Sequence, residues 1–205
     1  MIENYIIGSG GFAKEVYCIL KRNNKKVDGF ISLTTKPIKV QNKEYTPILQ
    51  EDFLKSANPN KANLYFGIGN PSIITSLNQK YLKFKFPNLL DPQAKIIGSV
   101  SMGQGNIFCC NCIFTTDIEI GSFNIFNIAC TIGHDTKIQD CNVFNPTTCI
   151  SGNVNIGSNN LFGVNSTVLQ NIKICSNNII GANALVTKDV TETGIYTGIP
   201  AKRKD

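Results

Sequence analysis

The sequence predicts a molecule of two parts, a small α/β domain followed by a parallel β-helix with three sides. Two observations support this fold class. An apolar residue recurs at every sixth position from Ile96 to Val186 without an insertion. Charge is also divided unevenly, because residues 1–95 carry 14 Lys/Arg against 7 Asp/Glu, whereas residues 96–205 carry 6 against 7. Since an exposed helical surface needs charged faces, the second part is not helical, and a domain boundary falls near residue 95.

The composition excludes several classes of protein. The chain has 205 residues, of which 42% are hydrophobic and 17% charged, as expected of a folded rather than a disordered protein. No apolar run approaches the roughly 20 residues of a membrane span, and the N-terminus lacks the features of a signal peptide. We therefore expect a cytoplasmic protein without a membrane span or a nucleic-acid partner. The basic first half could favour an anionic ligand, although scattered lysines are more typical of a solvated surface.

The eight cysteines do not predict a disulfide scaffold, because the chain is long and carries no secretion signal. Cys109, Cys110 and Cys112 cluster, which raises the alternative of a zinc site. No CxxC pair is present, however, and the single histidine, His134, is distant in sequence. We expect reduced thiols that pack as small apolar groups, and no bound metal.

The period of six predicts strands rather than helices. A helical period of 3.6 fits six badly, whereas an even period lets strands keep one face inward. Four residues after each apolar anchor the side chain is usually small, and three residues after it eleven of the sixteen hexads have Asn, Asp or Gly. Those three residue types tolerate the left-handed backbone conformation, so each hexad is predicted to be a short strand and a corner. The eleven are Gly105, Asn111, Asp117, Asp135, Asn153, Asn159, Asn165, Asn171, Asn177, Asn183 and Asp189.

Three corners close a triangular coil of 18 residues, and anchors 18 residues apart should stack. One column contains Phe108, Phe126, Phe144, Phe162 and Ile180. A second contains Met102, Ile120, Ile138, Ile156 and Ile174. The third contains Ile96, Phe114, Ile132, Ile150, Val168 and Val186.

This repeat resembles that of the hexapeptide-repeat acyltransferases. Their fold is a left-handed parallel β-helix, an exception to the usual right-handed crossover rule. The resemblance implies a homotrimer that binds acetyl-CoA as co-substrate in the groove between neighbouring prisms.

The first part alternates predicted strands and helices, which favours a small parallel sheet. Strands are expected at 4–8, 26–31 and 63–68, and helices at 14–22, 51–57 and 72–82. We expect a Rossmann-like domain over residues 1–85, a linker over 86–95, the β-helix over 96–190 and a C-terminal tail over 191–205.

A glycine-rich turn follows the first strand. Gly8, Gly10 and Ala13, with Asp28 about twenty residues on, fit a dinucleotide fingerprint. The alternative is a tight turn with no ligand. Because about 85 residues cannot supply a second mononucleotide half, a nucleotide diphosphate with a single base fits the space better.

Several motifs together resemble the bacterial sugar O-/N-acyltransferases. They are GSGGFAKE at 8–15, GIGNPSI at 67–73, NLLDP at 88–92 and GIPAK at 198–202, combined with the β-helix. That family includes sialic acid O-acetyltransferases and N-acetyltransferases of UDP-, dTDP- or GDP-linked 4-amino-4,6-dideoxy sugars. The resemblance implies that a nucleotide sugar lies against the N-terminal glycine loop and that its sugar reaches the β-helix of a neighbour.

Acetyl transfer from a thioester needs a base, and histidine is suited to this role near neutral pH. His134 stands beside a predicted corner, so its ring should point outward into the groove between subunits. The resemblance implies that His134 is catalytic and that Asp135 raises its basicity. Asp135 also occupies a corner position at which Asn or Asp is the default, and both interpretations stay open.

The resemblance assigns further site residues. It implies that the substrate meets Gly11, Phe12, Ala13, Ser32, Gly69 and Asn127. It implies that acetyl-CoA meets Gly152, whose N–H would bind the acyl carbonyl, together with Val164 and Ala182. Lys202 could meet a phosphate of CoA, and the alternative is a frayed basic tail without a ligand.

Two positions depart from the family. Val143 stands where many relatives have a second histidine that contacts the acetyl group. Ser32 and Leu33 stand where relatives often have paired acids, which leaves the base and the sugar open.

The leading hypothesis is an acetyl-CoA-dependent N-acetyltransferase that acts on the amino group of a nucleotide-linked 4-amino-dideoxy sugar. The alternative is an O-acetyltransferase of sialic acid or a related sugar, because amine and hydroxyl acceptors both need a base. A different class would be a non-catalytic β-helix scaffold or a cofactor-binding sensor.

Overall fold

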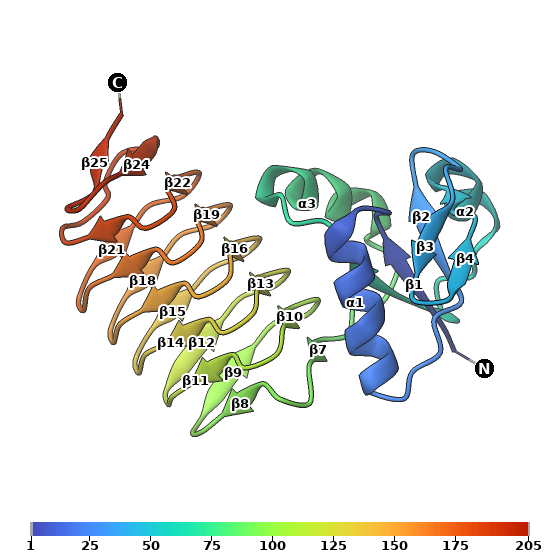
Figure 1. The fold of residues 1–205 in the computed structure, drawn as a ribbon, viewed down its shortest axis with the longest axis horizontal. Helices are drawn as coiled ribbons and strands as arrows, with labels where there is room; N and C mark the ends of the chain where they lie inside the picture. The colour runs from blue at the N-terminus through green and yellow to red at the C-terminus, as the bar shows by residue number, and fades with distance from the viewer. Residues whose placement is uncertain (1, 205) are drawn as a thin grey trace.

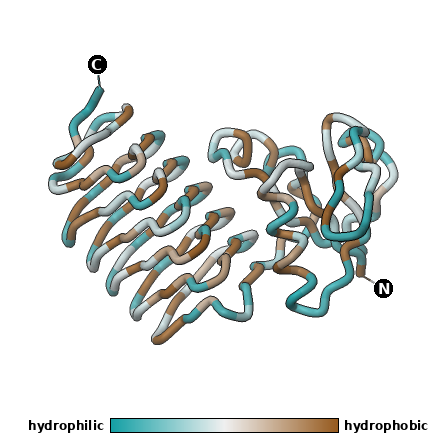
Figure 2. Tube along the Cα trace, viewed as in Figure 1, coloured by the Kyte–Doolittle hydropathy of each residue, from teal (hydrophilic) through white to brown (hydrophobic). Residues whose placement is uncertain are grey.

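The computed structural model describes residues 2–204 and confirms the predicted fold class (Figure 1). A small α/β domain leads into a triangular prism of stacked coils, which is a left-handed parallel β-helix. Figure 2 shows hydrophobic segments that recur along each coil of the prism. Among the described residues, no helix has the length and apolar character that crossing a bilayer would require.

A four-stranded parallel sheet in the order β5-β2-β1-β6 forms the centre of the N-terminal domain. Its strands are β1 (Glu3–Ile7), β2 (Gly29–Ser32), β5 (Ile48–Leu49) and β6 (Ala62–Phe66). Around it lie α1 (Gly11–Arg22), α2 (Gln50–Ser56), α3 (Pro71–Asn78) and the single 3-10 turn η1 (Gln79–Tyr81). The order of strands and helices agrees with the predicted alternation.

Local differences from the predicted elements have physical causes. α1 begins at Gly11, three residues before the predicted start, because Gly11 is itself the first helical residue after an extended Gly10. α3 begins at Pro71, where the Asn70 side chain accepts the Ile73 N–H at 3.2 Å. An antiparallel hairpin of β3 (Ile38–Val40) and β4 (Lys43–Tyr45) was not predicted, since these strands are too short for a clear period.

The prism has three sides, and over residues 89–186 each side is a stack of parallel strands in which residues 18 apart pair. The covered side contains β7 (Leu89–Leu90), β10 (Ile107–Phe108), β13 (Ile125–Phe126), β16 (Val143–Phe144), β19 (Leu161–Phe162), β22 (Ile179–Ile180), β24 (Ile195–Thr197) and β25 (Lys202–Arg203). The neutral side contains β8 (Lys95–Ile96), β11 (Ile113–Phe114), β14 (Thr131–Ile132), β17 (Cys149–Ile150), β20 (Thr167–Val168) and β23 (Leu185–Val186). The charged side contains β9 (Val100–Met102), β12 (Ile118–Ile120), β15 (Lys137–Ile138), β18 (Asn155–Ile156) and β21 (Lys173–Ile174).

These sheets extend beyond residues 96–190 at both ends. β7 lies in the expected linker and already pairs with β10. β24 and β25 lie in the expected tail, where β24 pairs with β22 at a spacing of 16 and β25 is antiparallel to β24. The first coil therefore begins directly after the N-terminal domain.

The three predicted columns of apolar anchors fill the prism. Phe108, Phe126, Phe144 and Phe162 stack with ring centroids 5.1, 4.8 and 4.6 Å apart and nearly parallel planes. Each ring is fully buried. Like residues thus pack on their copies one coil above and below, which is why the sequence repeats at spacing 18.

The corners adopt the predicted left-handed backbone. A positive φ occurs at every sixth residue from Gly105 to Asn183, including ten of the eleven predicted Asn, Asp and Gly positions. Asp189 is the exception, because it lies beyond the last regular corner. Four corners use other residue types, namely Phe123, Ala129, Cys141 and Thr147.

The N-terminal domain packs on the covered side of the prism. The outward side chains of Ile107, Ile125 and Val143 are almost fully buried in one hydrophobic cluster with the strands of the domain. Arg22 at the end of α1 pairs with the buried Asp91 at 3.1 Å. These contacts fix the domain against the first coils of the prism.

We name the three corners by what lies at them. The α1 corner (residues 109–112 and their repeats) joins the covered and neutral sides, and α1 lines a cavity with Cys110 and Ile128 there. The α3 corner (121–124 and repeats) joins the charged and covered sides, and Thr75 of α3 donates to Asn159 there at 3.3 Å. The histidine corner (133–136 and repeats) joins the neutral and charged sides, so it lies opposite the domain.

Candidate active site

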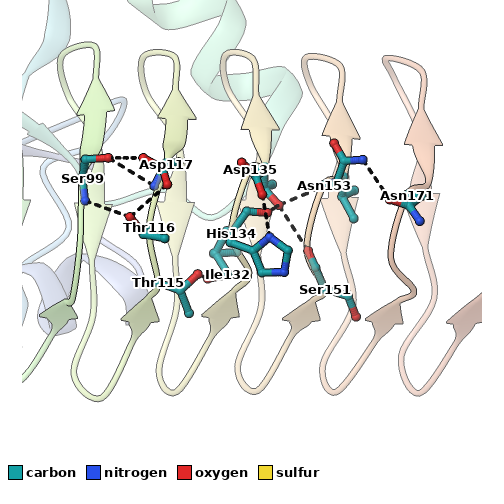
Figure 3. A network of polar contacts seen from close by, with 12 residues as sticks. Ser99, Thr115, Thr116, Asp117, Ile132, His134, Asp135, Ser151, Asn153 and Asn171 are labelled. Atoms are coloured by element: carbon teal, nitrogen blue, oxygen red, sulfur yellow. Dashed lines mark hydrogen bonds and ion pairs between the residues drawn. The ribbon is translucent and has the colours of Figure 1, made fainter.

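His134 projects from the histidine corner with its side chain 51% exposed (Figure 3). Its Nδ1 lies 2.6 Å from Oδ2 of Asp135. Because an ionised carboxylate only accepts hydrogen bonds, Nδ1 carries the hydrogen and donates it. The neutral ring then has its lone pair on Nε2, which is the arrangement of a general base.

Gly152, one coil further along the same corner, provides the space for this ring. A Cβ at Gly152 would lie 2.5 Å from Nε2 and 2.6 Å from Cε1 of His134. The ring therefore lies directly over the Gly152 backbone, and a side chain at 152 would displace it. The sequence predicted Gly152 as an acyl-carbonyl donor through its N–H and missed this steric role, which depends on the stacking of two coils.

Asp135 both makes the corner and contacts the ring of His134. Its φ of 58° makes the corner, and its N–H donates to the Thr116 carbonyl of the preceding coil at 3.2 Å. Its carboxylate at the same time orients the imidazole. The two roles are compatible because a left-handed corner residue directs its side chain outward.

The groove in front of His134 has a volume of about 540 Å³ and is open to solvent. It is lined by Asp117, Glu119, His134, Asp135, Lys137, Asn153, Gln170 and Asn171. Glu119 and Lys137 form an ion pair at 2.8 Å across two neighbouring strands of the charged side. The groove is therefore polar, and its charges lie on the coil of His134 and the coil before it.

The glycine loop lies at the carboxyl edge of the N-terminal sheet, where the ends of β1, β2 and β6 meet. A Cβ placed on Gly10, Gly11 or Gly69 would contact no atom within 4 Å, so these glycines border open space. Ser32 ends β2, and its hydroxyl lies 3.0 Å from that of Ser9. Phe12 is half-buried and Ala13 fully buried, so Ala13 packs in the core rather than against open space.

By contrast, Gly8 and Gly67 are needed for the fold. A Cβ at Gly67 would lie 2.7 Å from Ala13 of α1, and Gly8 has a φ of 113°. Close packing between the two loops therefore accounts for Gly8 of the predicted fingerprint, and for Gly67 of the GIGNPSI segment, without any ligand.

The structure divides the predicted site residues between two corners. Asn127, Val164 and Ala182 lie at the α1 corner, whereas His134, Asp135 and Gly152 lie at the histidine corner. Lys202 is exposed on β25 beyond the last coil. Since the two corners are the opposite edges of the neutral side, one chain does not bring these residues together.

The glycine loop is on the same side as the α1 corner. Lys14, in the first turn of α1, and Ile128, next to Asn127, line one cavity of about 260 Å³. The substrate-binding residues predicted in the N-terminal domain and Asn127 are thus neighbours, and both are separated from His134 of the same chain by the width of the prism. Val143 is buried beneath the domain on the covered side.

Comparisons with known proteins agree with this architecture. Residues 5–80 match the model of the PglD N-terminal domain. Three solved structures superpose on nearly the whole chain. The acetyltransferase domain of PglB from Neisseria gonorrhoeae has a TM-score of 0.90 at 23% identity, with 100% of both chains covered.

A histidine-to-asparagine mutant of perosamine N-acetyltransferase from Caulobacter crescentus, in complex with CoA and GDP-perosamine, has a TM-score of 0.89 at 23% identity over 99% of this chain and 97% of that one. WeeI from Acinetobacter baumannii has a TM-score of 0.88 at 23% identity over 100% of both chains. No curated protein matches the sequence significantly.

The chain has the fold of these three proteins. Four of the eight cysteines, Cys109, Cys112, Cys130 and Cys141, are buried in this fold. All eight are free, and burial raises the pKa of the Cys109 and Cys141 thiols, which keeps them protonated. Among residues 2–204, no three His, Cys, Asp or Glu side chains are grouped so that they could hold a metal ion.

Proposed function

We propose that this protein is an acetyl-CoA-dependent N-acetyltransferase that acts on the amino group of a nucleotide-linked 4-amino-dideoxy sugar. The observation that carries the proposal is the fixed ring of His134. Asp135 accepts from Nδ1, Gly152 leaves room for the ring, and Nε2 faces an open groove as a hydrogen-bond acceptor. No other histidine in the sequence can take this role.

In the proposed reaction the amine nitrogen attacks the thioester carbonyl carbon. The new N–C bond forms, the C–S bond breaks, and CoA leaves as a thiolate. His134 takes a proton from the attacking nitrogen at Nε2 and releases it to the thiolate, which balances the proton count. The Asp135 carboxylate stabilises the imidazolium formed between these steps.

The negative charge on the carbonyl oxygen needs a donor in the transition state. We assign this role to the N–H of Gly152, because the ring of His134 lies directly over that residue. This backbone donor needs no second histidine, in agreement with Val143 being buried at a distance from the histidine corner.

We further propose that the nucleotide diphosphate binds at the glycine loop. Open space at Gly10, Gly11 and Gly69 would allow a phosphate to approach the N-terminus of α1. Ser9 and Ser32 supply hydroxyl groups at the ends of β1 and β2, in place of the paired acids of many relatives. PerB from C. crescentus, a structural relative, was crystallised with CoA and GDP-perosamine, which supports a nucleotide-linked amino sugar as the acceptor class. Both proposed substrates belong to the cytoplasm, so we expect the protein to act there.

The proposed site needs more than one copy of the chain, and we propose a homotrimer. The neutral side has no charged outward residue between Ile113 and Leu185, in contrast to the charged side with Glu119, Lys137 and Lys173. If three neutral sides face a common axis, the histidine corner of each copy meets the α1 corner of the next. That arrangement would unite His134 and Gly152 of one copy with Asn127, Val164 and Ala182 of another.

The test is a thiol-release assay with acetyl-CoA against UDP-, dTDP- and GDP-linked 4-amino-4,6-dideoxy sugars and free sialic acid. We expect turnover with at least one amino sugar, and a loss of about 10²–10⁴-fold in kcat for His134→Ala because general-base catalysis is removed. Asn155→Ala, on the charged side and away from the groove, is the matched control. Near wild-type turnover of His134→Ala would contradict the proposal. So would the finding that none of the tested acceptors gives thiol release.

A further inference from the structure

The choice of corner residue changes next to His134. Among the fourteen left-handed corners, aspartate occurs only at positions 117 and 135, which are both at the histidine corner on consecutive coils. On the next two coils of the same corner the residues are Asn153 and Asn171, whose side chains join at 2.8 Å (Figure 3). Asn159 with Asn177, and Asn165 with Asn183, form the same contact at the other corners.

Asparagine is the favourable residue in such a stack, because each amide donates to the next. Two ionised aspartates cannot hydrogen-bond to each other, because neither carboxylate has a donor hydrogen. Neighbouring coils are only about 4.8 Å apart, so the two charges lie close together. Like charges directly opposite each other in a sheet destabilise it. The Asp117–Asp135 stack therefore lowers stability relative to the asparagine stacks in the same chain, and folding alone does not explain its presence.

The carboxylate of Asp117 is held in place. Its Oδ1 accepts from the Ser99 hydroxyl at 2.6 Å, and its Oδ2 accepts from the Thr116 hydroxyl at 3.2 Å. Among the ion pairs of residues 2–204, none involves Asp117, whereas the nearby Glu119 is paired with Lys137. The groove thus contains an oriented carboxylate without a basic side chain to balance it, one coil from the imidazole.

We propose that Asp117 is a specificity-determining residue that favours an acceptor carrying an ammonium group. This inference rests on the proposed acetyl transfer at His134. An amine reaches the site protonated at neutral pH, and the field of Asp117 and Asp135 attracts that positive charge to the groove. The ammonium then loses one proton to solvent, and His134 takes the second proton from the nitrogen as it attacks, as in the proposed reaction. A hydroxyl acceptor gains nothing from this field, and the carboxylate of a sialic acid is repelled by it. The charge pattern therefore favours the amino-sugar acceptor over the sialic acid alternative.

In the test, Asp117 is replaced by asparagine, the residue that forms the other stacked pairs at the corners. Asp117→Asn keeps the corner and removes the charge. Asp140→Asn is the matched control, because Asp140 is likewise an exposed, hydrogen-bonded carboxylate, which accepts the Ser122 N–H at 2.6 Å, but it lies at the α3 corner. The single histidine of the chain gives one imidazole signal in NMR, so binding near His134 can be followed without turnover.

Two probes are titrated into each protein while the His134 signal is followed. They are methyl 4-amino-4,6-dideoxyglucoside, which is a cation, and methyl 6-deoxyglucoside, which is its neutral hydroxyl analogue. We expect the wild type and Asp140→Asn to bind the amine more tightly than the hydroxyl probe. We expect Asp117→Asn to bind the amine roughly fourfold more weakly, the effect of one charge about 5 Å away in water, and the hydroxyl probe unchanged.

In the thiol-release assay, Asp117→Asn should lower kcat/KM for the amino-sugar acceptor while KM for acetyl-CoA stays the same. The same preference for the amine probe in Asp117→Asn and wild type would overturn the Asp117 proposal alone. An absence of acetyl transfer in wild type would instead overturn the proposed function, and the NMR titration would still decide the role of Asp117.

Discussion

His134 illustrates how a single residue acquires a defined geometry from its two neighbouring coils. Asp135, next in sequence, fixes Nδ1, and Gly152, 18 residues later, leaves room for the ring. The first contact is visible in the sequence as a His-Asp pair. The second is visible only once the period of 18 is known, because only then do 134 and 152 become neighbours.

The steric role of Gly152 can be separated from its proposed role as an N–H donor. Gly152→Ala keeps the N–H but places a Cβ where Nε2 now lies, so the ring must move. We expect kcat to fall by about 10²-fold, the cost of misplacing a catalytic group by about 1 Å, with little change in KM for acetyl-CoA.

Gly121→Ala is the control for general destabilisation, because an added Cβ is equally crowded there but lies at the α3 corner. Both variants should melt at a lower temperature than wild type, and only Gly152→Ala should lose turnover. Wild-type turnover of Gly152→Ala would show that the ring position does not depend on this glycine.

At the scale of the repeated element, a buried ladder of asparagines was missed from the sequence. Asn106, Asn124, Asn142, Asn160 and Asn178 lie inside the α3 corner and are almost fully buried. Each Oδ1 accepts a backbone N–H of the next coil, as Asn142 does from Asn160 at 2.9 Å. The ladder closes at Gly194, whose N–H donates to Asn178 at 2.9 Å.

The repeat predicted a small residue four positions after each apolar anchor. This holds at the α1 corner, where the inner positions are Cys112, Cys130, Thr148, Ser166 and Ala184. At the α3 corner the ladder replaces them. The abundance of asparagine therefore has two causes, since seven of the fifteen asparagines in 96–190 form left-handed corners and five form the ladder. Polarity alone could not distinguish an inner asparagine from a corner one.

Breaking the ladder should cost stability. Asn142→Leu keeps the volume but leaves the buried Asn160 N–H without its acceptor, and it removes the amide N–H groups that donate to Asn124 Oδ1 and to the Gln139 carbonyl. Since each unpaired buried group costs about 1–3 kcal/mol, we expect Tm to fall by about 10 °C in a thermal melt.

Asn155→Leu is the matched control, because Asn155 lies half-buried on the outer face of the charged side. Its Tm should change by no more than about 2 °C. Equal shifts for the two variants would mean that the ladder adds nothing beyond an ordinary surface asparagine.

The exceptional corners show where tertiary contacts outweigh local preference. Phe123 has a φ of 60°, yet its ring packs edge-on against Phe66 and Phe86 of the domain interface. Cys141 is buried at the same α3 corner, where it accepts from Asn78 of α3. Burial against the domain compensates for the strain at these two positions. We have no physical account of Thr147, which is β-branched, exposed and left-handed.

At the scale of the whole molecule, the sequence predicted both domains but not how they lie together. The period of six defines the prism, and the alternation of strands and helices defines the sheet. The domain covers the side of the prism that has apolar outward residues such as Ile107 and Ile125. In the sequence these residues resemble inner anchors. The division of the site between two corners follows only from that placement.

From this division of the site we propose that His134 of one copy acts on a sugar bound by the domain of another. Two variants, each expected to be inactive on its own, disable different parts of the proposed site. His134→Ala removes the base, and Gly11→Glu places a carboxylate in the open space at the N-terminus of α1, where a Cβ meets no atom within 4 Å. Light scattering should first show that each variant alone is a trimer.

The most direct measurement is the thiol-release rate of mixed trimers formed by co-expressing the two variants in equal amounts. If the site is shared between copies, an intact histidine corner meets an intact glycine loop at about one quarter of the interfaces by random assembly, and about one quarter of wild-type activity should return. If each chain completes its own site, no mixed trimer contains an intact one, and a rate no higher than that of the separate variants would contradict the account.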